Sequence, residues 1–263
     1  MKEKHLYICE NSTTGIFTGI YDAWAARHGH DNNRILVEEP LNYEFFTQLI
    51  KVEPDLEKAE KVKRSIIQKI SMDAYVMVYN ASLSKDKAKA DAIYRFLILG
   101  FAMGKNVMGH LSNPYVNHMA KMDLNVKNEL FHYEGFLRFL KLGNDVLLAR
   151  FRPENDILLS MAEHFVDRLP GENFIIYDER RIKAAVHQRG KGWMVVEDYP
   201  LELHTDWNQM EEQDEFLRMW KHFVDSIAIK ERKNEALQSN MMPNRFREFM
   251  PEVEYRKTKM HEA

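Results

Sequence analysis

The chain has 263 residues, of which 45% are hydrophobic and 29% are charged, and its formal net charge at pH 7 is −3. This composition is typical of a globular protein with a sizeable core, and the small net charge means that nucleic-acid binding would require a local basic patch. The single cysteine, Cys9, excludes an internal disulfide and any all-cysteine iron–sulfur or zinc site within the chain.

Residues 1–134 are predicted to form a mostly helical region that opens with a strand. The apolar run Leu6–Cys9 predicts the strand, and Ser12 or a following threonine can cap the helix that comes next. Apolar residues at helical spacing, and possible caps such as Ser71, predict further helices over 55–69, 72–83, 87–103, 105–111 and 114–134.

Residues 135–205 change from helical to strand periodicity. Two apolar runs, 136–140 and 146–151, flank the turn sequence Gly143-Asn144-Asp145 and predict a hairpin. A helix is expected from Pro153 to Phe165. Strands are expected over 174–177, 183–188 and 193–197, the last two paired across a glycine-containing turn. The short connections favour an antiparallel sheet covered by helices.

Residues 206–263 are predicted to form an acidic loop and a C-terminal helix with a basic end. The loop contains Asp206, Glu211, Glu212, Asp214 and Glu215, and apolar residues between 216 and 237 follow near helical spacing. The fold class is therefore α+β: a mostly helical N-terminal region and an antiparallel sheet covered by helices, closed by a C-terminal helix. We expect the three regions to form one compact unit.

The candidate catalytic residues lie in the segments 163–168 and 177–181. On a helix, His164, Asp167 and Arg168 share one face at i, i+3 and i+4, and Asp178 follows the next strand. A histidine beside a carboxylate can act as a general base. The alternative is that the imidazole packs at the helix end while Asp167 and Arg168 are solvated.

The candidate nucleic-acid-binding residues form two groups of cations and amides. They are candidates because phosphate contacts require clustered positive charge. They are Arg168, Arg180, Arg181, Lys183, Arg232, Lys233, Asn234, Gln238 and Arg245. Two other interpretations explain the same residues: a charged hairpin edge that prevents sheet aggregation, and a docked terminal helix with a solvated basic end.

Other motifs carry little signal. The segment His28-Gly29-His30-Asp31 reads as a loop rather than a metal site, and no metal site is expected. The sequence lacks a GxxxxGK loop, a dinucleotide fingerprint and a nucleophile elbow. No run of 18 apolar residues and no signal peptide is evident, so we expect a cytoplasmic protein without a membrane segment.

Several segments, taken in chain order, resemble a bacterial family of DNA-metabolism and DNA-repair proteins. They are 135–139, 153–168 ending in His-Phe-Val-Asp-Arg, 174–181 and 220–250, and the opening strand with residues 15–23 fits as well. The resemblance implies a gene neighbour that encodes a radical-SAM protein, and related domains fused to a uracil-DNA glycosylase-like domain. It supplies no catalytic residue.

The resemblance leads to one preferred hypothesis and two alternatives. The preferred one is an accessory protein that binds damaged or single-stranded DNA and docks a radical-SAM repair enzyme. A radical-SAM cluster needs three cysteines, so SAM and the iron–sulfur cluster are expected in that partner, with no cofactor in this chain. The alternatives are a free-standing enzyme that acts on a nucleobase or nucleotide through His164 with Asp167 or Asp178, and a protein–protein scaffold without nucleic-acid binding.

Overall fold

A computed structural model describes residues 3–42, 45–142, 145–198, 214–229, 232, 234–250 and 252–253. The chain divides into two compact units, unit 1 (Met1–Asn128) and unit 2 (Glu129–Ala263). Helix α5 (Pro114–Phe136) contains the boundary between the units, and the first boundary expected from the sequence, 134/135, also falls within this helix. The division into three regions stays a prediction.

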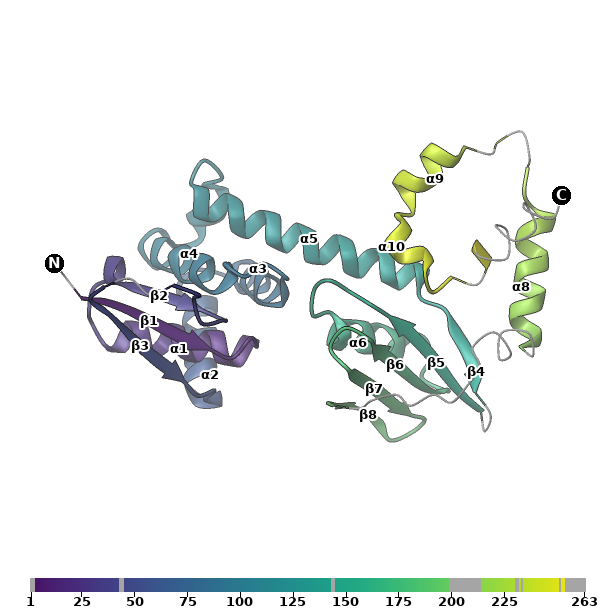
Figure 1. Ribbon diagram of the computed structural model, residues 1–263, viewed down its shortest axis with the longest axis horizontal. Helices are drawn as coiled ribbons and strands as arrows, with labels where there is room; N and C mark the ends of the chain where they lie inside the picture. Colours follow the sequence, from purple (N-terminus) through teal and green to yellow (C-terminus); the bar gives the residue numbers. More distant parts are fainter. Residues whose placement is uncertain are drawn as a thin grey trace. The chain divides into compact units, whose positions relative to one another are not determined.

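Unit 1 contains a parallel sheet of three strands in the order β2-β1-β3 (Figure 1). The predicted first strand is β1 (Lys4–Cys9), and it pairs with β2 (Asn33–Leu36) and β3 (Thr47–Val52). The sequence-based prediction missed β2 and β3. Strand β2 has only four residues, and β3 is an edge strand that is largely exposed. Neither therefore shows the extended alternation of apolar and polar residues that predicts a strand.

The helices of unit 1 begin where their capping residues predict. Ser12 accepts a hydrogen bond from the Gly15 amide at the start of α1 (Thr13–Ala25), and Ser71 accepts one from Ala74 at the start of α3 (Met72–Leu83). Between them lies α2 (Leu56–Lys69), and α4 (Lys89–Met103) follows α3. Two short 3₁₀ helices, η1 (His30–Asn32) and η2 (Gly104–Gly109), complete the unit; η2 covers much of the predicted 105–111 helix.

Helix α1 packs closely on β1 at Gly19. A Cβ atom at this position would overlap the Cys9 sulfur, so glycine permits the close approach of helix and strand. Burial raises the pKa of the Cys9 thiol to about 12. The only cysteine is therefore a neutral core residue at physiological pH.

Unit 2 is built on a five-stranded sheet in the order β4-β5-β6-β7-β8. The hairpin of β4 (Phe139–Leu142) with β5 (Val146–Phe151) is confirmed, as is the hairpin of β7 (Lys183–Gln188) with β8 (Gly192–Val196). Strand β6 (Asn173–Asp178) completes the sheet, and α6 (Leu158–Arg168) packs on β6, β7 and β8 (Figure 1). The α+β class is confirmed.

One pairing in this sheet differs from the antiparallel pattern expected from the sequence. Strands β5 and β6 are parallel, with Val146 opposite Asn173 and Phe151 opposite Asp178. The reason is that α6 returns the chain to the starting end of the sheet, and such a crossover makes the flanking strands parallel. The carboxyl ends of β5 and β6 therefore lie at the same edge.

The C-terminal elements are α8 (Glu215–Ser226), α9 (Glu235–Met241) and α10 (Asn244–Arg247). The buried ring of Phe246 in α10 stacks on His132, with the centroids 4.9 Å apart, and meets Tyr133 edge-on at 4.8 Å. Asp214 caps α8 and accepts a hydrogen bond from the Lys141 amide of the edge strand β4. Asp206, Glu211 and Glu212 of the predicted acidic loop lie outside the described residues.

Among the described residues, no helix combines the length and the apolar character that a membrane crossing requires.

The anchoring of α10 leads to a prediction about stability. Replacing Phe246 by alanine leaves a cavity among the rings of α5, and we expect the free energy of unfolding of unit 2 to fall by about 3–5 kcal/mol. Urea unfolding followed by circular dichroism measures the change. Phe216→Ala is the matched control, because Phe216 is largely exposed. Equal stability of the two variants would contradict the packing of α10.

Candidate nucleic-acid interface

A loop at the carboxyl end of β5 is held by a buried carboxylate of α5. The loop, residues 152–157, replaces the first turn of the helix that the sequence predicts from Pro153. Glu129 accepts hydrogen bonds from the backbone N–H groups of Glu154 (2.9 Å) and Asn155 (2.8 Å), and from the Asn155 side-chain amide (2.7 Å). Both Glu129 and Asn155 are buried. The carboxylate therefore stabilises an irregular segment whose amides would otherwise lack partners.

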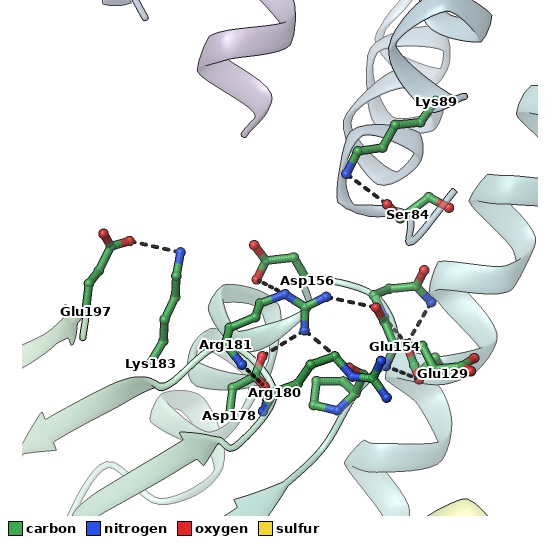
Figure 2. Close-up of polar contacts among 12 residues, drawn as sticks. Ser84, Lys89, Glu129, Glu154, Asp156, Asp178, Arg180, Arg181, Lys183 and Glu197 are labelled. Atoms are coloured by element: carbon green, nitrogen blue, oxygen red, sulfur yellow. Dashed lines mark hydrogen bonds and ion pairs between the residues drawn. The ribbon is translucent and has the colours of Figure 1, made fainter. Parts of the chain in front are cut away.

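Arg181, in the turn between β6 and β7, holds the same loop from the other side. Its guanidinium donates to the carbonyl groups of Pro153 (3.2 Å) and Glu154 (2.8 Å), and pairs with the Asp178 carboxylate at 2.9 Å (Figure 2). A longer ion pair of 3.7 Å joins it to Asp156. Arg181 is thus a structural clamp with its donors already engaged, and a phosphate would have to displace these contacts to reach it.

Asp178 is the buried anion under this clamp. One carboxylate oxygen accepts hydrogen bonds from the backbone N–H groups of Arg180 (2.9 Å) and Arg181 (3.2 Å), and the other accepts from the Arg181 guanidinium. Burial raises the pKa of Asp178, and the guanidinium of Arg181 opposes this rise. Asp178 therefore has a structural role: it stabilises the turn, and both of its carboxylate oxygens already accept hydrogen bonds.

The two basic groups predicted from the sequence meet at Glu154. Arg245 of α10 pairs with the Glu154 carboxylate at 2.6 Å, while Arg181 bonds the backbone carbonyl of the same residue. Close by in sequence, Arg152 pairs with Glu179 at 2.9 Å and with Glu248 at 3.1 Å. The side chains of Arg152 and Arg245 remain 48% and 43% exposed, so their ion pairs with Glu248 and Glu154 lie in contact with solvent, whereas the Glu179 side chain is only 16% exposed.

The other predicted nucleic-acid-binding residues differ in their surroundings. Lys183 pairs with Glu197 at 2.9 Å, and Asn234 caps α9 by accepting from the Leu237 amide. The remaining described residues of the set are exposed: Arg168, Arg180, Arg232 and Gln238. Lys233 lies outside the described residues.

The candidate catalytic residues do not form a constellation within the described part of the chain. His164 lies 3.6 Å from the Glu134 carboxylate of α5, in an edge-on contact with Phe165. Asp167 is exposed on α6, and no contact between His164 and either aspartate is found among the described residues. The same part of the chain contains no group of three or more histidine, cysteine or acidic residues that could hold a metal ion.

Sequence reasoning missed Glu129, Arg152 and Glu154. Glu129 contacts the loop across 25 residues of sequence. An acidic residue within a long helix is ordinarily predicted to be exposed to solvent, so the sequence does not indicate this contact. Arg152 and Glu154 flank Pro153. The sequence signal that could have identified them is charge: counted together with residues 178–183, they belong to one charged cluster.

The family model described as "Domain of unknown function (DUF4130)" matches residues 87–252, which is more than half of the chain. The match includes the whole of the loop, its two clamps and α10. No curated protein matches the chain.

The burial of Glu129 leads to a second prediction. Glu129→Ala leaves the buried donors of Asn155 without an acceptor, and we expect unfolding free energy to fall by about 3–5 kcal/mol. Glu129→Gln keeps one acceptor oxygen and should cost less than half as much. Urea unfolding compares the two variants. Identical, near-wild-type stability in both would show that the carboxylate does not hold the loop.

Proposed function

The chain belongs to the DUF4130 family of domains of unknown function, and we propose that it is a DNA-binding accessory protein of DNA metabolism or repair. The observation that supports this proposal is the convergence of two separate basic segments on the loop 152–157. Residues far apart in sequence, Arg152 and Arg245, present guanidinium groups beside Glu154 and Glu248, and Arg180 lies exposed in the turn that clamps the same loop.

The ion pairs of this surface are of a kind that a phosphate can replace. A solvent-exposed salt bridge contributes about 0–1 kcal/mol, so the exchange of a carboxylate for a phosphate oxygen costs little. Arginine binds phosphate with two parallel hydrogen bonds, a geometry that lysine cannot reproduce. The pairs Arg245–Glu154 and Arg152–Glu248 are therefore the exchangeable ones, whereas Arg181 and the pair of Arg152 with the more enclosed Glu179 stabilise the fold.

The ligand of this surface is proposed to be damaged or single-stranded DNA. With a net charge of −3 over the whole chain, binding depends on the local cluster and is expected to weaken steeply with salt. A radical-SAM repair enzyme is proposed as the protein partner, and SAM and its iron–sulfur cluster would reside there, because this chain has one buried cysteine. A cytoplasmic location is part of the same proposal.

A double variant tests the DNA-binding surface. Arg180→Ala combined with Arg245→Ala removes two exposed cations and leaves the Arg181 clamp intact. For single-stranded DNA, the slope of log K against log salt should become shallower by about 1.4, or about 0.7 for each lost phosphate contact. Fluorescence anisotropy with a labelled oligonucleotide measures the slope.

The matched control for this variant is Arg34→Ala with Arg64→Ala, which removes the same charge from exposed positions of unit 1. It should bind like the wild type. The proposal would be contradicted if the wild-type chain does not bind DNA at low salt, either alone or mixed with the radical-SAM protein. Equal losses in the two double variants would show a non-specific charge effect.

Removing a carboxylate should have the opposite effect. Glu154→Gln keeps the backbone contacts of the loop but frees Arg245 from its anion, so the affinity for single-stranded DNA should rise by about threefold to tenfold at low salt. Glu60→Gln, on α2 of unit 1, is the control. Weaker binding by Glu154→Gln would indicate that Glu154 itself contacts the ligand and that Arg245 does not.

A further inference from the structure

Ile182, in the turn between β6 and β7, has a backbone conformation that its side chain disfavours. Its φ angle is 56°, in the left-handed region. A β-branched residue is an outlier there because its Cβ substituents crowd the backbone, whereas glycine and asparagine adopt this region readily. The other described non-glycine residues with positive φ are Arg27, Phe46, Asp145 and Asp198, and none of these is β-branched.

The contacts that fix this turn explain the conformation but not the isoleucine. Asp178 accepts hydrogen bonds from the amides of Arg180 and Arg181, and the Arg181 guanidinium bonds the carbonyl groups of the loop 152–157. None of these bonds uses the side chain at position 182, so glycine or asparagine would keep them all and relieve the strain. Residues held in disfavoured conformations gather at functional sites. The isoleucine side chain therefore points to a role outside the turn.

The surroundings of Ile182 combine an apolar tip with cations. Ile182 is 45% exposed, Arg180 is exposed, and Lys183 pairs with Glu197 at 2.9 Å (Figure 2). The Glu197 side chain is 66% exposed, so a phosphate can replace it at little cost. A single exposed isoleucine is ordinary on a protein surface. Ile182 differs because it is strained, lies between cations and belongs to the turn that holds the loop 152–157.

We infer that Ile182 is an apolar wedge that inserts into the base stack of duplex DNA at a mismatched pair, an inference that rests on the DNA binding proposed above. Proteins that kink DNA insert side chains such as isoleucine, leucine or phenylalanine between base steps and partly unstack them. Arg180 and Lys183, on either side of Ile182 in the chain, can bind phosphates that flank the opened step. A duplex with a mismatched pair is then the preferred ligand of this surface.

A wedge must be stiff, because otherwise the turn yields instead of the base stack. Buried Asp178 fixes the backbone of the turn, and the Arg181 guanidinium joins the turn to the loop 152–157. The branched side chain of Ile182 also has few χ1 rotamers to lose. Groups that are ordered before binding lose little conformational entropy when the complex forms. The turn therefore has the rigidity that insertion requires.

The free energy of unstacking determines which DNA is preferred. An intact base step resists opening, and the cost of opening is least at a mismatched or damaged pair. Phosphate contacts are nearly the same for both kinds of duplex, so the cations contribute affinity without discrimination. The wedge supplies the discrimination, and we expect the mismatched duplex to bind about tenfold more tightly than the matched one.

Fluorescence of 2-aminopurine tests the wedge. The probe is a duplex with 2-aminopurine next to one mismatched pair, and unstacking raises its emission. The wild-type chain should raise the emission and prefer this duplex to a matched one. Ile182→Asn should lose both effects, while the salt dependence of binding stays that of the wild type because the phosphate contacts remain. Ile182→Leu keeps an apolar side chain and should retain both effects.

Thermal unfolding separates this role from a structural one. Asparagine adopts the left-handed region readily, so the unfolding temperature of Ile182→Asn should be no lower than that of the wild type. A lower temperature would assign the side chain to the fold and overturn the wedge. Met194→Asn, at an exposed apolar position of β8, is the matched control and should keep the preference for the mismatched duplex.

The binding data distinguish failure of the wedge from failure of the proposed function. Salt-dependent binding of both duplexes with equal affinity, or an unchanged preference in Ile182→Asn, would overturn the wedge and leave DNA binding in place. A wild-type chain that binds neither duplex nor a single-stranded oligonucleotide at low salt would overturn both.

Discussion

The candidate site depends on two buried carboxylates that hold one irregular loop from opposite sides. Glu129 satisfies the amides of Glu154 and Asn155, and Asp178 orients the guanidinium of Arg181 toward the carbonyl groups of the same loop. A buried carboxylate is costly unless it is hydrogen-bonded, and here the hydrogen bonds come from backbone groups that need partners themselves. The hydrogen bonds between carboxylate and backbone thus offset the desolvation cost of both groups.

This arrangement separates the arginines into two functional classes. Arg181 is largely enclosed and bonds two carbonyl groups and a buried anion, so its removal would disturb the turn as well as the charge. Arg152 and Arg245 are half exposed, and their ion pairs with Glu248 and Glu154 reach solvent, so these two partners can be exchanged at little cost. The pair of Arg152 with Glu179 is more enclosed, since the Glu179 side chain is only 16% exposed. A rigid loop with exchangeable cations around it is the geometry on which the proposed DNA contact rests.

The sequence was most informative where structure is set locally. Ser12 and Ser71 cap the helices that they predict, and both hairpins follow from alternation and turn residues. It was least informative for parallel pairing, because β2 has only four residues, β3 is largely exposed, and the β5–β6 pairing depends on the crossover through α6. The site was half predicted: the cations were identified from charge clustering, but Glu129 has no local signal that distinguishes it from a solvated acid.

The most direct test of DNA binding at the loop 152–157 is an NMR titration of the arginine side chains with a single-stranded oligonucleotide. If the loop 152–157 organises the DNA-binding surface, the Nε–Hε signals of Arg152, Arg180 and Arg245 should shift together as the oligonucleotide is added. The signal of the enclosed Arg181 should move less, and those of Arg34 and Arg64 should stay in place. Shifts confined to unit 1, or no shifts at low salt, would contradict DNA binding at this surface.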